Sequence, residues 1–267
     1  MPDPQTLADG KLRLDYPAEH VARITLTKSE KKNALDHLML DTIAEVVPTI
    51  DARCLIVTGE GGIFSAGYDI GSFPPETFAQ EAERLVAHPF HSAVEALENF
   101  PFPTLAVLPG HAIGGGLELA LACDLRIASL EAKVGMPPGK LGLVYSHTGI
   151  KKFLDAAGST RTRELFFTAR NISAPRAFAW GLINEIYSAE EIEAEGLRWA
   201  TEVAANAPIS LSGNKKVIGA LLDAGHELDP ELEAELIELR KSCFATEDFH
   251  EGVTAFAERR PPVWKGR

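Results

Sequence analysis

The sequence predicts an α/β protein with a helical C-terminal part, and three observations lead to this. Strand-like runs lie in the first 205 residues, an order of strand, glycine turn and helix occurs twice, and the pattern is mostly helical from Ala174 onward. A chain of 267 residues with 45% hydrophobic residues is long enough to bury a substantial core. We therefore expect an α/β core over residues 1–205 and a helical subdomain over residues 206–267.

The first expected strand is Val21–Leu26, where polar and apolar residues alternate as in a half-buried strand. A helix is expected next over Asn33–Val47, because apolar residues there recur at helical spacing. Cys54–Thr58 is a short apolar run, typical of a buried strand, and it leads into the turn Gly59–Gly62. The chain thus begins with strand, helix and buried strand before its first glycine turn.

Helical periodicity returns over Phe78–Leu97, with a break expected near Pro89 because proline removes a hydrogen bond from a helix interior. Thr104–Leu108 is a further expected strand, and it leads to the glycines Gly114–Gly116 and then to an apolar helix over Leu117–Cys123. Two later segments are also expected to be regular, a strand at Leu125–Ala128 and a helix at Pro230–Phe244.

Charge and cysteine content narrow the classes of function. The 26 Lys and Arg residues stand against 38 Asp and Glu residues, a net charge of −12 that disfavours binding to nucleic acid or to an anionic membrane. An anionic substrate would then need a local cationic or dipolar site. Cys54, Cys123 and Cys243 are widely spaced without a CxxC pair, so we expect neither disulfides nor a metal site, and a cytoplasmic location.

The first candidate site is the segment Phe64–Ile70, which follows the buried strand Cys54–Thr58. Its small residues allow a ligand to approach the backbone closely. Taken alone, the same residues fit a tight turn in which Asp69 caps a helix, so the segment needs a second feature to indicate a function.

The second candidate site is the helix start at Gly114–Gly116, where glycines leave the first N–H groups of the helix uncovered by side chains. A partial positive charge of about half an elementary unit is expected there. Close helix packing would explain the glycines equally well. Glu118, however, lies in an otherwise apolar stretch, and a buried carboxylate needs a partner or a function.

The two segments, taken together and in this order, resemble the paired signatures of the crotonase superfamily, which includes enoyl-CoA hydratases and isomerases. The similarity extends from Lys32–Leu35 to Glu251–Phe256 and Arg260–Pro261. It implies a crotonase-type spiral of repeated ββα units and an acyl-CoA substrate, with no separate cofactor. It also implies a homotrimer or a dimer of trimers, with the C-terminal helices at the subunit interface.

The resemblance further implies that the backbone N–H groups of Tyr68 and Gly115 form an oxyanion hole for the thioester carbonyl. Preorganised N–H donors bind the enolate oxygen that develops during reaction better than they bind the ground-state carbonyl. Ala66 would lie where the backbone receives the adenine of coenzyme A. The substrate-binding residues implied in this turn and the next are Ala66, Gly67, Asp69, Ile70 and Gly114.

The resemblance leaves the reaction open. Hydratases of this superfamily use two glutamates, the second about twenty residues after the first, to hold and deprotonate a water molecule. Glu118 matches the first glutamate, but Pro138 stands at the second. Tyr145 lies in a Leu-Gly-x-x-Tyr segment that is similar to the methylmalonyl-CoA decarboxylases of the superfamily, and it is a candidate proton donor. Tyr145 also fits a core tyrosine bonded to a backbone acceptor.

We therefore favour decarboxylation of a 2-carboxyacyl-CoA such as methylmalonyl-CoA, because loss of carbon dioxide generates the enolate without a base. One alternative is an enoyl-CoA hydratase or isomerase that uses Glu118 as acid and base. Another is a non-catalytic homologue that binds CoA or RNA, although the net charge of −12 argues against RNA.

Two groups of cationic residues are candidates to meet the phosphates of coenzyme A. One lies near the C-terminus and includes Lys265, and the other lies near the start of the chain and includes Lys28. Both equally fit solvated basic surface. The cations are Arg259, Arg260, Lys265 and Arg267 in the first group and Lys28, Lys31 and Lys32 in the second.

Overall fold

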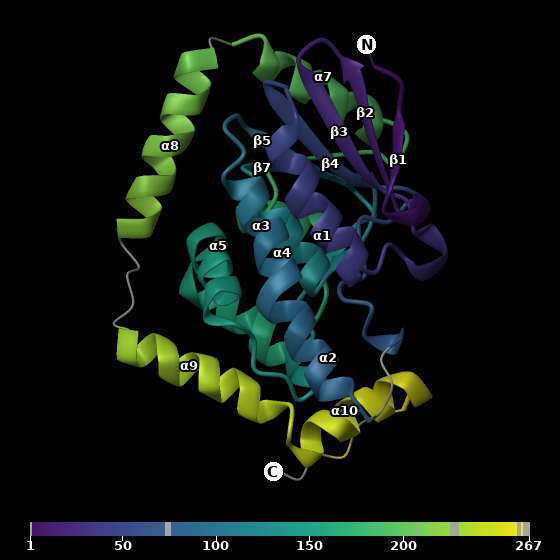
Figure 1. The fold of residues 1–267 in the computed structure, drawn as a ribbon, viewed down its shortest axis with the longest axis vertical. Helices are drawn as coiled ribbons and strands as arrows, with labels where there is room; N and C mark the ends of the chain where they lie inside the picture. Colours follow the sequence, from purple (N-terminus) through teal and green to yellow (C-terminus); the bar gives the residue numbers. More distant parts are fainter. Residues whose placement is uncertain (1, 73–75, 207, 225–229, 261–262, 264–267) are drawn as a thin grey trace.

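The computed structural model describes the whole chain except residues 1, 73–75, 207, 225–229, 261–262 and 264–267. Within the described residues the strands form a seven-stranded sheet and a three-stranded sheet, with helices packed around them (Figure 1). The predicted α/β class with helices at the C-terminus is confirmed. No helix in the described part of the chain is both long enough and apolar enough to cross a membrane.

The larger sheet has the order β1-β2-β3-β4-β5-β7-β10 in the described part of the chain. β2 pairs antiparallel with both β1 and β3, whereas the neighbouring strands from β3 to β10 pair parallel. The strands are β1 (Gln5–Leu7), β2 (Leu12–Ala18), β3 (Val21–Leu26), β4 (Cys54–Gly59), β5 (Thr104–Leu108), β7 (Leu125–Ser129) and β10 (Glu185–Tyr187). The smaller sheet joins β6 (Ala112–Ile113), β8 (Lys133–Gly135) and β9 (Ile172–Ser173).

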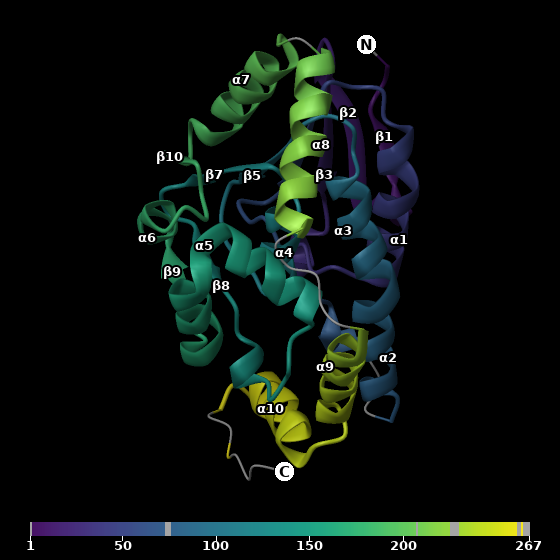
Figure 2. The same cartoon turned by 90° about the vertical axis from the view of Figure 1, so that its left-hand side faces the viewer.

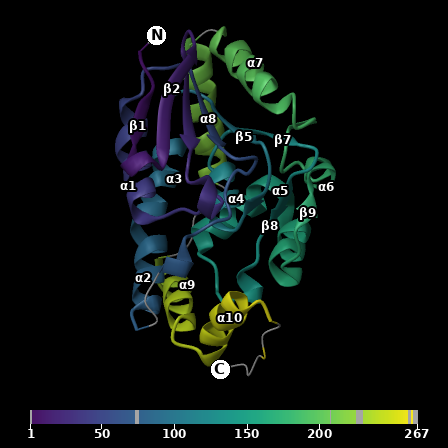
Figure 3. The ribbon, with the colours of Figure 1, turned by 90° about the vertical axis from the view of Figure 1, so that its right-hand side faces the viewer.

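The strands predicted as short apolar runs are buried on both faces of the large sheet. Leu55 and Val57 of β4 lie in the main core with α1 and α3, whereas Ile56 lies in a second core covered by α7. Figures 2 and 3 show these helices on opposite sides of the sheet. Because successive residues of a strand point to opposite faces, a strand covered on both sides must be apolar throughout.

The helices come from all parts of the chain. The first four are α1 (His37–Val46), α2 (Phe78–Leu85), α3 (His91–Glu98) and α4 (Gly115–Leu121). They are followed by α5 (His147–Thr168), α6 (Ala174–Ala179), α7 (Ile192–Ala204), α8 (Pro208–Ala224), α9 (Pro230–Cys243) and α10 (Glu247–Glu258).

The helix predicted over Asn33–Val47 begins later than predicted. α1 starts at His37, and the side chain of Asp36 caps it by accepting a hydrogen bond from a backbone N–H of the first turn. Leu35, whose apolar side chain suggested helical spacing, forms instead a single β-bridge with Tyr68. The stretch before α1 is therefore extended, and it lies beside the first candidate site.

The break predicted near Pro89 is confirmed. α2 ends at Leu85, residues Val86–Phe90 form a π-helical turn (η5) that contains Pro89, and α3 begins at His91. A proline cannot donate the hydrogen bond that a regular helix requires, and a wider turn accommodates this loss. The turn brings Phe90 to the site, as described below.

Residues 147–168 form a long helix, α5, which the sequence pattern does not predict. The helix is irregular at Gly158, where φ is 75°, so its apolar residues follow no single stripe. Its start is fixed by Ser146, whose hydroxyl accepts a hydrogen bond from the Gly149 N–H at 3.1 Å. This start sets the position of Tyr145, the residue before the cap.

The three C-terminal helices lie along one side and the lower end of the molecule in Figure 1. α7 ends at Ala204 and α8 begins at Pro208, so the boundary predicted at residue 205 falls between two helices. Lys215 ties α8 to the core, since its ammonium donates to Asp124 at 2.8 Å and to the Phe102 carbonyl at 3.1 Å. The division into two domains and the oligomerisation role of the second stay predictions.

Candidate active site

The first candidate segment, Phe64–Ile70, lies between Leu35 and β6 and forms a single β-bridge with each. At the Leu35 bridge, the Leu35 N–H donates to the Gly67 carbonyl and the Asp69 N–H donates to the Leu35 carbonyl, both at 2.8 Å. Because N–H groups alternate between the two sides of an extended chain, the Tyr68 N–H points away from Leu35 and toward the side of β6.

The second candidate segment approaches the first at two glycines. Gly114 has φ 57° and ψ −126°, a conformation that favours glycine, and Gly115 opens α4, so the Gly115 N–H has no acceptor within the helix. A methyl group added at Gly67 would lie 3.3 Å from the Gly115 nitrogen and 2.8 Å from the Ile113 oxygen. The backbones of the two segments are therefore nearly in contact, as the pairing of the two motifs predicts.

The ring of Tyr68 covers the start of α4. A methyl group added at Gly115 would lie 2.5 Å from Cε1 and 2.8 Å from Cζ of Tyr68, so the ring fills the space that a side chain would need. Phe90 contacts the Tyr68 ring edge to face, with centroids 5.0 Å apart and an interplanar angle of 87°. The ring is thus held between the glycine and the π-helical turn.

Glu118 lies in the first turn of α4 and is 4% exposed. The Tyr145 hydroxyl donates a hydrogen bond to its Oε2 atom, and the same hydroxyl lies 3.3 Å from the Tyr68 hydroxyl. The structure therefore brings three of the predicted site residues into one chain of hydrogen bonds, from Glu118 through Tyr145 to Tyr68. The sequence indicated Glu118 and Tyr145 as residues of one site, but it indicated neither their contact nor a role for the Tyr68 hydroxyl.

The protonation states follow from burial. Burial raises the pKa of Glu118 to about 7, although the hydrogen bond from Tyr145 and the charge of Lys152 oppose this rise. Burial, together with the neighbouring negative charge of Glu118, also raises the pKa of Tyr145 well above its ordinary value. Glu118 therefore exchanges its proton near neutral pH, whereas Tyr145 stays a neutral hydroxyl.

The side of Tyr145 away from Glu118 is apolar. Its ring contacts Phe166 with centroids 5.7 Å apart. Nearby, Pro138 is buried at the start of a 3-10 turn, η6 (Pro138–Lys140), and lines a pocket of about 420 Å³ with Leu143, Ile150 and Phe166. The position that the second glutamate of a hydratase would occupy therefore borders an apolar pocket.

Two lysines hold the side chain of Asp69. Lys28 is 7% exposed, and its ammonium lies 2.8 Å from Asp69 and 2.7 Å from Asp36, while the half-exposed Lys31 lies 3.1 Å from Asp69. Burial disfavours the ionised form of Asp69, but the hydrogen bonds from both lysines outweigh burial and hold its pKa below the ordinary value. The substrate-binding role of Lys28 stays a prediction, and its observed partners are these two carboxylates.

The remaining residues of the first turn differ in exposure. Ala66 is exposed, and its N–H donates to the Lys32 carbonyl at 2.9 Å. Ile70 packs against a cluster formed by Phe244 and Phe249. The segment around α10 therefore borders the turn that carries Tyr68, and the roles of Ala66 and Ile70 in substrate binding stay predictions.

The C-terminal cations are only partly described. Lys265 and Arg267 lie outside the described residues. Arg260 binds two carboxylates, with Nη1 2.6 Å from Glu251 and Nε 2.6 Å from Glu258. Within the described ranges no cluster of His, Cys, Asp and Glu side chains has an arrangement that would hold a metal ion.

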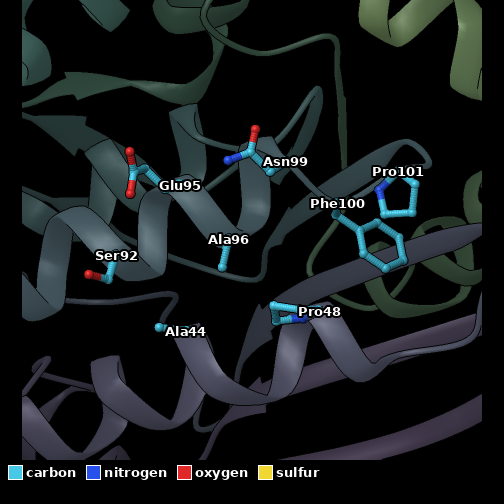
Figure 4. A pocket seen from close by; sticks show the side chains of 8 residues that line it. All are labelled: Ala44, Pro48, Ser92, Glu95, Ala96, Asn99, Phe100 and Pro101. Atoms are coloured by element: carbon cyan, nitrogen blue, oxygen red, sulfur yellow. The ribbon is translucent and has the colours of Figure 1, made fainter.

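A separate pocket of about 390 Å³ lies between α1 and α3 (Figure 4). Its polar side chains are Ser92, Glu95 and Asn99, and its other lining residues are Ala44, Pro48, Ala96, Phe100 and Pro101. It shares no residue with the two glycine turns, so it offers neither their N–H donors nor the hydrogen-bonded chain of Glu118.

Comparisons with known proteins agree with this geometry. Residues 17–267 match the family model described as enoyl-CoA hydratase/isomerase. The methylmalonyl-CoA decarboxylase of Escherichia coli (strain K12) is 30% identical over 251 residues, which cover 92% of this chain and 95% of that protein. The similarity therefore spans nearly the full length of both.

Two solved structures extend the comparison. One, a methylmalonyl-CoA decarboxylase in complex with 2-nitronate-propionyl-CoA, is similar with a TM-score of 0.87 at 28% identity and covers 96% of this chain and 99% of that chain. The other, an enoyl-CoA hydratase from Bacillus anthracis, has a TM-score of 0.75 at 28% identity and covers 96% of this chain and 100% of that chain.

The raised pKa of Glu118 predicts a specific dependence of stability on pH. In the unfolded chain the group has its ordinary pKa of 4.5, so between pH 4.5 and about 7 the folded chain binds more protons. Its contribution to stability therefore falls as the pH rises through this window. We expect Glu118→Gln to stabilise the chain by about 2–3 kcal/mol more at pH 8 than at pH 5 in urea unfolding. An equal effect at both pH values would contradict the raised pKa.

The buried ammonium of Lys28 predicts a cost for its removal. Lys28→Met removes the buried ammonium that Asp36 and Asp69 share, so we expect a loss of about 3 kcal/mol in the free energy of unfolding. The matched control is Lys31→Met, which removes a 51% exposed lysine from the same Asp69 and should cost no more than about 1 kcal/mol. Equal losses in urea unfolding would show that burial does not distinguish the two lysines.

Proposed function

Because the chain belongs to the enoyl-CoA hydratase/isomerase family of the crotonase superfamily, we propose that it binds an acyl-CoA thioester at Tyr68 and Gly115 and stabilises the enolate. The crotonase-type α/β fold expected from the sequence is confirmed by the same comparisons. Membership makes the chain a crotonase-superfamily enzyme that acts on an acyl-CoA. The particular reaction and the roles of the residues are our proposals.

The near contact of the two glycine turns supports an oxyanion hole at Tyr68 and Gly115. The Gly115 N–H opens α4 without an acceptor in that helix, and the partial positive charge of the helix start adds to its attraction for an anion. Such donors stabilise the enolate oxygen more than the thioester carbonyl, so they lower the barrier. One donor of this kind contributes roughly 3 kcal/mol in other enzymes.

The reaction that we propose is decarboxylation of a 2-carboxyacyl-CoA such as methylmalonyl-CoA, and the observation that carries it is Pro138 at the position of the second glutamate of the hydratases. Glu118 is buried against Tyr145, while the position of a second glutamate is Pro138, which lines an apolar pocket. Two-carboxylate hydration lacks its second group here.

Decarboxylation uses the groups that are present. The bond between the carboxylate and the α-carbon breaks, carbon dioxide leaves, and the electron pair passes into the thioester to form the enolate. The α-carbon then takes up one proton. The pKa of Glu118 is about 7, so near neutral pH this buried carboxyl, with the neutral Tyr145 beside it, is a suitable proton source.

The comparisons favour the same reaction, since the decarboxylase structure has a TM-score of 0.87 and the hydratase structure 0.75 at the same 28% identity. The second candidate is an enoyl-CoA isomerase or hydratase in which Glu118 moves the proton alone. The observation that favours it is the pKa of about 7, which also suits a general base near neutral pH.

We also propose that the chain forms a homotrimer or a dimer of trimers through its C-terminal helices. On α8, Val217 and Ile218 are 57% and 58% exposed, and Leu222 is 45% exposed, which is unusual for neighbouring large apolar side chains. We further propose that the protein is cytoplasmic and that Lys28 and Lys265 bind the phosphates of coenzyme A.

The reaction can be tested by giving the protein methylmalonyl-CoA, malonyl-CoA and crotonyl-CoA in separate assays. We expect release of carbon dioxide from at least one of the 2-carboxyacyl-CoA substrates and slow or absent hydration of crotonyl-CoA. The measurements are carbon dioxide evolution and the loss of the enoyl absorbance. Fast hydration without carbon dioxide release would overturn the decarboxylase proposal.

Replacing Glu118 separates the two candidate functions. Since decarboxylation needs no base, Glu118→Gln should retain measurable carbon dioxide release, lowered by roughly a hundredfold. It should also lose the fall in rate that we expect of the wild type above pH 7. Isomerase or hydratase chemistry would lose all turnover. Glu95→Gln, on α3 and outside the site, is the matched control and should behave as the wild type. Complete loss of carbon dioxide release in Glu118→Gln would count against decarboxylation.

A further inference from the structure

We propose that the side chain of Tyr68, in addition to its backbone N–H, takes part in the reaction. Its hydroxyl gives the proton to the α-carbon of the enolate and is recharged from Glu118 through Tyr145. This inference rests on the proposed enolate chemistry and adds a residue to it. It follows from the position of the Tyr68 hydroxyl and from the direction in which the hydrogen-bonded chain can transfer protons.

The position of the Tyr68 hydroxyl is fixed on several sides. The ring lies on Gly115, with Cζ, the carbon that bears the hydroxyl, 2.8 Å from where a side chain at Gly115 would begin. Phe90 holds the ring edge to face, and the Tyr145 hydroxyl lies 3.3 Å from the Tyr68 hydroxyl. The hydroxyl of Tyr68 therefore lies beside the backbone of the same two residues that are proposed to hold the thioester oxygen.

Tyr68 is a better terminal donor than Tyr145 because of their surroundings. Tyr145 is 8% exposed and is enclosed between Glu118 and Phe166, whereas Tyr68 is only partly buried and lies on the glycine turn itself. A group that donates a proton must come within hydrogen-bond reach of the reacting atom, directly or through one water molecule. Tyr145 is thus placed in the middle of the chain and Tyr68 at its substrate end.

Each hydroxyl carries one hydrogen, and this fixes the direction of the chain. When Glu118 is ionised, Tyr145 donates to it, and Tyr68 must then donate to Tyr145. When Glu118 is protonated, the order reverses: Glu118 donates to Tyr145, Tyr145 donates to Tyr68, and the Tyr68 hydrogen points away from Tyr145. Only the protonated chain presents a proton beyond Tyr68.

The transfer balances in protons. After carbon dioxide has left, the Tyr68 O–H bond breaks as the new C–H bond forms at the α-carbon. Tyr68 takes the Tyr145 hydrogen, and Tyr145 takes the proton of Glu118, which becomes a carboxylate. One proton from solvent restores Glu118, so the turnover consumes one proton and releases one carbon dioxide. The 3.3 Å between the hydroxyls is long for such a bond, and catalytic hydrogen bonds commonly shorten when substrate binds.

Other charged groups face the Glu118 end of the chain. Lys152 of α5 lowers the pKa of Glu118, and Glu98 of α3 raises it. The two side chains form an ion pair with each other. The effects of Lys152 and Glu98 oppose each other, so burial dominates the pKa of Glu118. Below neutral pH, Glu118 therefore carries the proton that the hydrogen-bonded chain transfers.

The test is the stereochemistry of protonation in D2O. Wild type is expected to convert methylmalonyl-CoA to propionyl-CoA with deuterium in one configuration at C2, because one fixed donor serves one face of the enolate. Tyr68→Phe keeps the ring on Gly115 but lacks the donor. We expect it to give a mixture of both configurations and a product-forming rate lowered roughly a hundredfold.

Two further variants complete the design. Tyr145→Phe removes the hydroxyl that passes the proton from Glu118 to Tyr68, but it leaves the Tyr68 hydroxyl in place. We therefore expect this variant to be slower than the wild type and to give the same single configuration at C2. Tyr16→Phe, on β2, is the matched control and should resemble the wild type in both rate and configuration. If Tyr68→Phe keeps the wild-type rate and configuration, the inference is wrong even if carbon dioxide is released.

A second arm separates failure of this inference from failure of the proposed reaction. Propionyl-CoA itself is incubated in D2O, and deuterium uptake at C2 is followed without any decarboxylation. Uptake by the wild type and its loss in Tyr68→Phe would support the relay even if methylmalonyl-CoA released no carbon dioxide. Equal uptake by both proteins, or none by the wild type, would overturn it.

Discussion

The structure of the site depends on the near contact between two backbone turns. A methyl group at Gly67 would lie 3.3 Å from the Gly115 nitrogen, and one at Gly115 would lie 2.5 Å from the Tyr68 ring. A side chain at Gly67 would push the two backbones apart, and one at Gly115 would displace the Tyr68 ring. The two N–H groups proposed to bind the thioester oxygen are therefore brought together by the absence of two side chains, and the rest of the fold holds this contact in place.

The surroundings hold the contact from both sides. On one side, Lys28 joins Asp69 of the first turn to Asp36, the cap of α1, through a buried hydrogen bond to Asp69 and a partly buried one to Asp36. On the other, the chain of Glu118, Tyr145 and Tyr68 joins the first turn of α4 to the segment before α5. An ion pair on the first side and a hydrogen-bonded chain on the second suit the proposed chemistry, which needs rigid backbone donors and a group that can supply a proton.

Much of the fold could be predicted from the sequence because short apolar runs report burial directly. The bounds of β3 and β5 agree with those predicted. α1 begins later than predicted because the apolar residue Leu35 forms a β-bridge with Tyr68 and is not part of the helix. The sequence pattern did not predict α5, because this helix is irregular at Gly158 and lacks a clear apolar stripe. In the site, residue types indicated Glu118 and the glycines, whereas contacts between distant residues, such as those of the Tyr68 hydroxyl, depend on tertiary packing.

The central claim is that Tyr68 and Gly115 bind the thioester oxygen through their backbone N–H groups. The most direct test is a crystal structure of the protein with an acyl-CoA analogue that cannot react. The account predicts the thioester oxygen within about 2.7–3.1 Å of both backbone nitrogens. A thioester oxygen held elsewhere, with either N–H bonded to another acceptor in the complex, would contradict it.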